Sequence, residues 1–375
     1  MINVETISNK EVTVGIVSAK EIVTDEGIVS WHEGQIQFDG RLYDRLDFTP
    51  LLRHKHQFTL HNVVIGKQFH WQRHQRQTFS GQLHFIVEGE NITAVNRLPI
   101  EDYLTSVISS EMRATSSLQF LKAHAIIARS WLLAQRTLPE PPHRNYDVCA
   151  DDHCQRYQGI TMATNPHVMQ AVEETRGMVL TYKGRICDTR YSKCCGGRTE
   201  LFDTCWDEHE PHPYLQSVAC PYCNTTDAGI LRQVLNDYDQ ETHDFYHWHV
   251  DYTRDELSDL IARKLGTDIG TVTAIEALSR GPSGRISKLR IAGSKREVTI
   301  GKELNIRKAL SPTHLYSSAF DIRPTATGFS IDGHGWGHGV GLCQIGAAVM
   351  GHQGADYTTI LQHYYQDTKI TQLYE

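Results

Sequence analysis

Residues 98–112 read LPIEDYLTSVISSEM, and this stretch marks the change from strand-like to helix-like patterning along the chain. Within it, Leu104, Val107 and Ile108 follow one another at helical spacing, and Glu111 takes the next position of the same apolar stripe. Because burial disfavours an unpaired carboxylate, an acid in such a place is either paired with a cation or kept for function. A carboxyl group on an apolar surface can serve as a proton donor near neutral pH.

The residues before this stretch favour β-structure. Short alternating runs such as 12–17 and 83–87 are separated by Gly and Asp turns, which is typical of strands. We therefore expect a β-rich N-terminal lobe over residues 1–98.

The residues after it favour a second helix. Apolar side chains recur every three or four positions between 118 and 132, and Ser116 followed by Gln119 matches a capping box. This pattern predicts a helix that begins near Ser116 and ends near 136, with residues 112–115 as a break. Glu111 would then lie at a corner between two helices.

Further along, prolines near 140 open a loop-rich region that runs to about residue 223. A helical pattern at 255–265 and strand patterns at 287–291 and 296–300 indicate another mixed unit. We predict an α+β fold with three parts and a cleft between the lobes. These parts are the β-rich lobe 1–98, a core formed by 99–224 and 326–375 that carries the key glutamate, and an inserted α+β lobe at 225–325.

Composition narrows the function classes. The net charge of −7, with 22% charged residues, argues against nucleic acid as the main partner, because phosphate binding needs a basic face. We expect no membrane span, since no stretch approaches the roughly 20 apolar residues required. The N-terminal residues lack a signal-peptide pattern, which leaves a cytoplasmic protein or an exported one whose leader is absent from this sequence.

A glycine-rich segment lies near the C-terminus. Five alternate glycines run from Gly333 to Gly341, interleaved with His334, Trp336 and His338. Such a segment lets backbone approach backbone or ligand closely, but its spacing fits neither a dinucleotide nor a phosphate-binding loop. Two interpretations stay open: a tight structural crossing with both histidines turned outward, or the lining of a sugar site.

The nine cysteines suggest metal or redox chemistry, and their odd number leaves at least one outside any intramolecular disulfide. One group lies at 143–154, where we expect the neighbours His153 and Cys154 not to bind the same ion. The other lies at 194–223 and includes a C-x-x-C pair, half of a common zinc site. Structural zinc, disulfides and free thiols remain open, depending on the redox compartment. The candidate ligands are His143, Cys149 and Cys154 in the first group and Cys194, Cys220 and Cys223 in the second.

The stretch 98–112, together with LKAHAIIARS at 121–130, closely resembles the core of the SpoIID family, named after stage II sporulation protein D. Segments at 155–159, 196–199, 333–346 and 360–365 resemble the family's remaining blocks in the same order. The resemblance covers roughly residues 90–370. The pair Cys194-Cys195 departs from the serine that the family more often carries there, and some family members hold zinc near residues 143–154.

That family contains sporulation lytic transglycosylases, which cut peptidoglycan glycan strands lacking peptides, and proteins described as amidase enhancers. The resemblance implies that Glu111 is the catalytic acid. It would protonate the oxygen between MurNAc and GlcNAc and then deprotonate the MurNAc C6 hydroxyl, which closes onto C1 to give a 1,6-anhydro end. One carboxylate suffices, unlike the two of ordinary glycoside hydrolysis. No cofactor is required for this chemistry, and a zinc ion would brace loops.

Several expectations accompany this assignment. The alternative for Glu111 is a structural ion pair with Arg129 or Arg113, and we interpret Glu101 and Asp102 as structural acids of the first helical turn. Peptidoglycan glycan is the expected partner, and the second functional reading is a wall-binding modulator of a cell-wall amidase. The family implies the cell envelope or periplasm, whereas a role in sporulation does not follow from the sequence. The candidate substrate-binding residues are Gln155, Tyr157, Arg198, His334, Trp336, His338 and Gln344.

Overall fold

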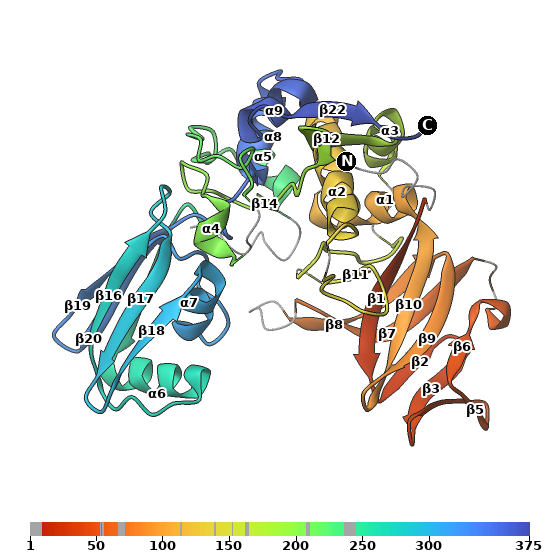
Figure 1. The fold of residues 1–375 in the computed structure, drawn as a ribbon, viewed down its shortest axis with the longest axis horizontal. Helices are drawn as coiled ribbons and strands as arrows, with labels where there is room; N and C mark the ends of the chain where they lie inside the picture. The colour runs from red at the N-terminus through yellow and green to blue at the C-terminus, as the bar shows by residue number, and fades with distance from the viewer. Residues whose placement is uncertain are drawn as a thin grey trace. The chain divides into compact units, whose positions relative to one another are not determined.

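Figure 1 shows a computed structural model of the chain, which describes residues 10–52, 54, 56–66, 72–112, 115–138, 140–151, 153–161, 165–207, 211–235 and 245–375. Strands and helices are both abundant and form several sheets, which confirms the α+β class. The chain divides into two compact units, which we call unit 1 (Met1–Asp188 with Lys369–Glu375) and unit 2 (Thr189–Thr368). These units cut across the three parts expected from the sequence, because the first helices belong with the N-terminal strands.

Unit 1 contains two large sheets and one small one. The predicted strands at 12–17 and 83–87 are present within β1 and β9, and the order of the five-stranded sheet is β11-β1-β10-β9-β6. Its strands are β1 (Glu11–Ala19), β6 (Arg45–Asp47), β9 (Gln82–Glu88), β10 (Asn91–Pro99) and β11 (Val148–Cys149). The six-stranded sheet, β5-β4-β3-β2-β7-β8, comprises β2 (Glu21–Thr24), β3 (Gly27–His32), β4 (Gln35–Phe38), β5 (Arg41–Tyr43), β7 (Gln57–Ile65) and β8 (Arg73–Ser80), and a short 3-10 helix, η2 (Thr49–Leu51), precedes β7.

The helices of unit 1 come after β10 in the chain, and the first of them follows it directly (Figure 1). They are α1 (Ile100–Glu111), α2 (Leu118–Gln135) and α3 (Pro166–Glu174), and α1 packs against both other helices. The capping prediction was one residue early, since Ser117 is the N-cap and its hydroxyl accepts from the amide of Phe120 at 3.3 Å. The small sheet joins β13 (Arg185–Ile186), β12 (Met178–Tyr182) and β22 (Lys369–Gln372), so the C-terminal strand completes unit 1.

Unit 2 is built from three small sheets and six helices among the residues described. The sheets are β14 (Tyr191–Ser192) with β21 (Leu342–Cys343); β15 (His247–Thr253), β20 (Gly328–His334) and β19 (Phe320–Pro324); and β16 (Val272–Arg280), β17 (Ile286–Gly293) and β18 (Glu297–Gly301). The helices are α4 (Phe202–Cys205), α5 (Ala228–Val234), α6 (Arg254–Leu265), α7 (Glu303–Ala309), α8 (Gln344–His352) and α9 (Tyr357–Tyr364).

The middle of unit 2 has its own hydrophobic core, formed by apolar residues between Trp248 and Ile331. The predicted helix at 255–265 is present as α6, which begins at a capping box of Thr253 and Glu256 and ends at Gly266 with φ 61°. The predicted strands at 287–291 and 296–300 correspond to β17 and β18, the latter starting one residue later. Within the described ranges, no helix combines the length and apolar character needed to cross a lipid bilayer.

Candidate active site

Glu111 is the last residue of α1, and its side chain is only 7% exposed. The helix ends there because Met112 adopts an extended backbone, with φ −127° and ψ 152°. In the part of the chain that the structure describes, no side chain or backbone group forms a hydrogen bond or ion pair with the Glu111 carboxylate. Glu111 is therefore a buried acid without a partner among these residues.

The cation expected as its alternative partner is used elsewhere. Arg129 donates to both carboxylate oxygens of Glu101, from Nε to Oε1 at 3.0 Å and from Nη2 to Oε2 at 2.5 Å. The Tyr374 hydroxyl also donates to Glu101 Oε1, at 2.7 Å. Arg113, the other cation considered, lies outside the described residues. Glu101 is thus the buried acid of α1 that pairs with a cation. Arg129 is bound to Glu101 and does not pair with Glu111.

The segment 155–159 holds the C-terminal half of α1. The hydroxyl of Ser106 donates to the carbonyl of Gly159 at 2.7 Å, and the Ser110 hydroxyl accepts from the amide of Gln158 at 3.3 Å. Gly159 has φ +74°, and a Cβ atom there would lie 2.1 Å from the carbonyl oxygen of Thr78. Close packing of this segment fixes the backbone just before Glu111.

Two predicted sugar ligands, Gln155 and Tyr157, are each only 1% exposed. Gln155 accepts from the Tyr103 hydroxyl at 3.1 Å and donates to the carbonyl of Ala128 at 3.2 Å. The Tyr157 hydroxyl donates to Asn96 at 2.5 Å, and its ring stacks on Tyr103 with centroids 5.3 Å apart. Their polar groups are used inside unit 1, so the structure gives no support to direct contact with substrate.

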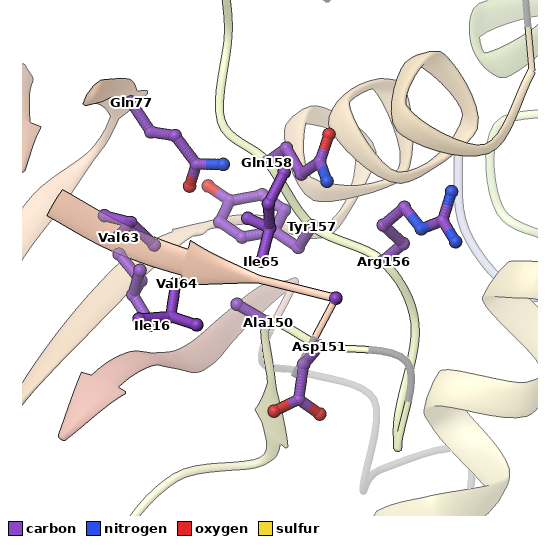
Figure 2. A pocket seen from close by; sticks show the side chains of 11 residues that line it. Ile16, Val63, Val64, Ile65, Gln77, Ala150, Asp151, Arg156, Tyr157 and Gln158 are labelled. Atoms are coloured by element: carbon purple, nitrogen blue, oxygen red, sulfur yellow. The ribbon is translucent and has the colours of Figure 1, made fainter. Parts of the chain in front are cut away.

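A small pocket lies beside this segment, between it and strands β1, β7 and β8 (Figure 2). Its volume is about 20 Å³, room for about one water molecule. Ile16, Gln77, Asp151 and Tyr157 are among the residues that line it. A cavity of this size does not admit a sugar ring.

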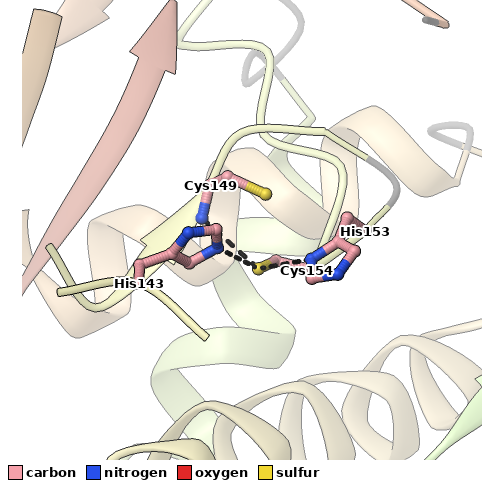
Figure 3. A group of neighbouring side chains, drawn as sticks. All are labelled: His143, Cys149, His153 and Cys154. Atoms are coloured by element: carbon pink, nitrogen blue, oxygen red, sulfur yellow. Dashed lines mark hydrogen bonds between the residues drawn. The ribbon is translucent and has the colours of Figure 1, made fainter. Parts of the chain in front are cut away.

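The first group of cysteines and histidines converges in unit 1 (Figure 3). One ligand atom from each of His143, Cys149, His153 and Cys154 lies within 4.8 Å of the others, and this closeness weighs against the expectation that His153 and Cys154 do not bind the same ion. Nε2 of His143 is 3.3 Å from Sγ of Cys154, and β11 pairs Cys149 with Gly15 of β1. Hydrogen bonding to Cys154, followed by burial, raises the pKa of the Cys149 thiol. Two thiols and two imidazoles form a donor set that fits zinc.

The second group converges in unit 2 with a different membership from the one predicted. The Sγ atoms of Cys195, Cys220, Cys223 and Cys343 all lie within 4.8 Å of one another, and all four residues are buried. Cys195 is in this set in place of Cys194, and Cys343 joins it from the glycine-rich segment. The set therefore unites residues 195–223 with the start of α8.

The glycine-rich segment is a tight crossing around one buried arginine, Arg285. The arginine donates from Nε to the carbonyl of Gly337 at 3.0 Å and from Nη1 to the carbonyl of Cys195 at 3.0 Å. A Cβ atom on Gly339 would lie 2.5 Å from Cζ of Arg285. Within this segment, Gly335, Gly337, Gly339 and Gly341 have φ between +71° and +91°.

Arg285 belongs to a buried polar network that sequence reasoning missed. Its Nη1 donates to the hydroxyl of Ser283 at 2.9 Å, and that hydroxyl donates to Oε2 of Glu200 at 2.6 Å. Glu200 is fully buried, and its other oxygen accepts from the amide of Leu201 at 2.7 Å. Glu200 and Arg285 are 85 positions apart in the sequence, so no local sequence pattern predicts this network.

Both histidines of the segment face protein groups. His334 is half-buried with Nε2 3.3 Å from the carbonyl of Ser283, and burial lowers its pKa. In His338, Nδ1 accepts from the amide of Val340 at 3.0 Å, while burial and then Arg190 lower its pKa well below the usual value. His338 is therefore a neutral, inward-facing imidazole, and the structural reading with both histidines turned outward is wrong in that detail.

The remaining candidates in unit 2 differ in exposure. Trp336 is half-buried, and its ring meets Tyr316 edge-on with centroids 5.5 Å apart. Arg198 is exposed and donates to the carbonyl of Ser217 at 3.3 Å, whereas Gln344 is buried at the start of α8. Glu111 belongs to unit 1 and these residues to unit 2, and the cleft predicted to join them stays a prediction.

Gly339→Ala is expected to lower the free energy of unfolding of unit 2 by about 1–3 kcal/mol more than Gly354→Ala. Both glycines have positive φ, +76° and +93°, so the backbone strain of the two changes is matched. Only Gly339 places a methyl group against Arg285, which is buried and hydrogen-bonded, while nothing lies within 4 Å at Gly354. Urea unfolding followed by fluorescence measures both variants, and equal losses would contradict the packing described.

Comparison with known proteins gives two family matches. A model described as Stage II sporulation protein matches residues 88–182, the region that contains α1, α2 and the first group of cysteines and histidines at 143–154. A model described as a domain of unknown function matches residues 200–341, within unit 2. Together they cover parts of both units.

Several relatives align with most of the chain. An uncharacterized protein of Brachyspira hyodysenteriae is 31% identical over 78% of this chain and 72% of its own length. Stage II sporulation protein D of Bacillus amyloliquefaciens is 27% identical over 74% of this chain and 76% of its own length. The amidase enhancer of Bacillus subtilis is 25% identical over 72% of this chain but 40% of its own length. The chain belongs to the SpoIID family.

Proposed function

We propose that this protein is a lytic transglycosylase that cleaves the bond between MurNAc and GlcNAc in peptidoglycan glycan strands freed of peptides. Glu111 is its general acid and then its general base. Membership of the SpoIID family supports a cell-wall role, and relatives are named for sporulation and for enhancing an amidase. The cell wall is accordingly the proposed place of action.

The observation that carries this function is that the buried Glu111 carboxylate has no hydrogen-bond or ion-pair partner among the described residues. Of the glutamates that the structure describes, four are buried: Glu101, Glu111, Glu200 and Glu303. Glu101 pairs with Arg129, Glu200 bonds Ser283 and Thr204, and Glu303 lies 3.4 Å from Arg307. Buried acids are normally paired, so a buried acid without a described partner is a candidate for proton transfer.

Hydrogen bonds hold α1 in place, as the role of Glu111 as a general acid requires. A general acid must keep its position relative to the oxygen that it protonates, and rigid elements hold such groups better than loops do. Ser106 and Ser110 tie α1 to the segment 155–159, while Tyr103 ties it to Gln155. The side chain of Glu111 therefore starts from a fixed backbone.

The proposed reaction needs one carboxyl group. Glu111 gives its proton to the glycosidic oxygen as the bond from MurNAc C1 to that oxygen breaks, so GlcNAc leaves with a hydroxyl. The resulting carboxylate takes the proton of the MurNAc C6 hydroxyl while O6 bonds to C1. The acid is regenerated, no water is consumed, and the product ends in 1,6-anhydroMurNAc. Ordinary glycosidases use a second carboxylate because water is their final nucleophile.

The first group of cysteines and histidines, at 143–154, would stabilise the structure around Glu111. His143, Cys149, His153 and Cys154 would hold a zinc ion, and the chemistry it supplies when bound is a structural cross-link of the loop 143–154. Cys154 directly precedes the segment 155–159 that holds α1. These four residues would thereby stabilise the position of Glu111 without taking part in proton transfer.

A second candidate function has one observation in its favour. The amidase enhancer of Bacillus subtilis aligns with 72% of this chain at 25% identity. By analogy, this protein would bind the wall and raise the activity of an amidase without cutting glycan. In that function Glu111 has no proton to transfer.

The products formed by the wild-type protein test the proposal. Glycan strands stripped of peptides are incubated with it, and mass spectrometry separates 1,6-anhydroMurNAc ends from hydrolysed reducing ends, which are heavier by one water. We expect anhydro ends to accumulate. Reducing ends alone would indicate a hydrolase. Uncut strands, with faster peptide release when an N-acetylmuramoyl-L-alanine amidase is added to whole peptidoglycan, would favour the modulator.

A further inference from the structure

Four buried thiols of unit 2 converge on one point of the structure. The Sγ atoms of Cys195 and Cys223 are 3.6 Å apart, and all four Sγ atoms lie within 4.8 Å of one another. Zinc bonds thiolates at about 2.3 Å, so two ligands on a tetrahedral zinc ion lie about 3.8 Å apart. We propose that Cys195, Cys220, Cys223 and Cys343 bind one structural zinc ion in unit 2.

The arrangement fits a metal better than disulfides. A disulfide needs sulfur atoms about 2.05 Å apart and joins residues in pairs, with no reason for two pairs to meet at one point. Here the sulfur atoms of Cys195 and Cys223 are 3.6 Å apart, and each of the four sulfur atoms lies within 4.8 Å of the other three. A single tetrahedral ion explains a convergence of four thiols.

Backbone amides are aimed at the sulfur atoms. The amide of Cys195 donates to Sγ of Cys343 at 3.3 Å, and the amide of Gly197 donates to Sγ of Cys223 at 3.3 Å. The amide of Gly346 also points at Cys343 Sγ, at 3.5 Å. Donors of this kind stabilise the negative charge of metal-bound thiolates and orient them.

Cys220 is enclosed as closely as the others. The hydroxyl oxygen of Tyr364 lies 3.3 Å from its sulfur, and a Cβ atom on Gly346 would lie 2.6 Å from that sulfur and 2.4 Å from the hydroxyl. Only glycine fits at position 346. The walls of the site are therefore specific in shape as well as in donors.

The site would join three segments that are far apart in sequence. Cys195 lies just after β14, Cys220 and Cys223 form a turn, and Cys343 is the N-cap of α8. The carbonyl of Cys195 also accepts from Arg285, the arginine at the centre of the glycine-rich crossing. Four protein ligands complete a tetrahedral ion and leave no position for water, so the metal is structural and fixes this crossing.

The zinc content of three purified proteins tests the assignment. Wild type, Cys223→Ser and Cys205→Ser are prepared without chelator, and bound zinc is measured by mass spectrometry of the element. Cys205 is the matched control, because it is buried in the same unit outside the cluster. We expect Cys223→Ser to lose one equivalent relative to both other proteins. Unchanged zinc in Cys223→Ser, or a disulfide among the four cysteines in wild type, would overturn the site.

A measurement on a protein with all four ligands intact covers the case in which Cys223→Ser does not fold. His143→Ala with Cys149→Ser removes the first cluster and leaves the second complete. Zinc X-ray absorption of this protein is expected to give sulfur neighbours alone, at about 2.3 Å. A nitrogen shell at about 2.0–2.1 Å, or a protein without zinc, would contradict four-thiolate ligation. None of these readouts depends on glycan cleavage, so they stand apart from the proposed function.

Discussion

Glu111→Gln is expected to reduce the rate of 1,6-anhydroMurNAc formation by roughly 10²- to 10⁴-fold, the range associated with loss of a general acid or base. The amide has nearly the shape of the carboxyl group but neither donates the proton to the glycosidic oxygen nor removes one from the C6 hydroxyl. Since Glu111 has no partner among the described residues, the change leaves none of the cations in that part of the chain unpaired. Stability is therefore expected to stay close to wild type while product formation falls.

Asp102→Asn is the matched control for this variant. It makes the same change of carboxylate to amide on the same helix, at an exposed position of the first turn. Glycan cleavage by Asp102→Asn should equal that of wild type, with anhydro ends counted by mass spectrometry and urea unfolding measured on each protein. A folded Glu111→Gln protein that retains wild-type cleavage would assign the proton transfer to another group.

The sequence was most informative where the structure depends on local spacing. The apolar stripe of Leu104, Val107 and Ile108 is a property of one helix, and α1 contains it with Glu111 as its last residue. The start of α2 was missed by one position because two adjacent serines, Ser116 and Ser117, can each cap a helix. Period and capping are read over a few residues, which is why these elements were predictable.

Contacts between segments that are distant in the sequence have no local sequence pattern that predicts them. Cys343 joins cysteines more than a hundred positions away, and Glu200 meets Arg285 only through Ser283. Nor does the sequence distinguish the adjacent Cys194 and Cys195, of which the structure groups Cys195 with the other three thiols. Long-range pairing and side-chain direction in a loop are set by the whole fold.

Polar residues within family blocks posed a different difficulty. Gln155 and Tyr157 have groups suited to sugar hydroxyls, yet the structure uses these groups to bond Tyr103, Ala128 and Asn96. A buried polar side chain must find a partner, and that partner can be protein or ligand with equal chemical reason. Residue type alone does not distinguish the two cases.

Arg129→Met is expected to lower the free energy of unfolding of unit 1 by about 3–5 kcal/mol, because it leaves the carboxylate of Glu101 buried without its cation. Arg129 is fully buried, and it also donates to the carbonyl of Met178 at 3.0 Å. Methionine fills much of the same volume, so the decrease in the free energy of unfolding comes mainly from the lost charge and hydrogen bonds. Urea unfolding followed by circular dichroism measures the change.

Arg176→Met is the control for side-chain type, since Arg176 pairs with Glu173 at the surface and its loss should leave the urea midpoint unchanged.

The double variant Arg129→Met with Glu101→Leu separates the effect of the ion pair from the effect of burying a charge. Replacing both charges with apolar groups removes the stranded carboxylate, so most of the stability should return. Recovery should be incomplete, because the Tyr374 hydroxyl and the Met178 carbonyl each lose a partner. An Arg129→Met protein as stable as wild type would mean that the ion pair does not hold α1, and with it Glu111, in place.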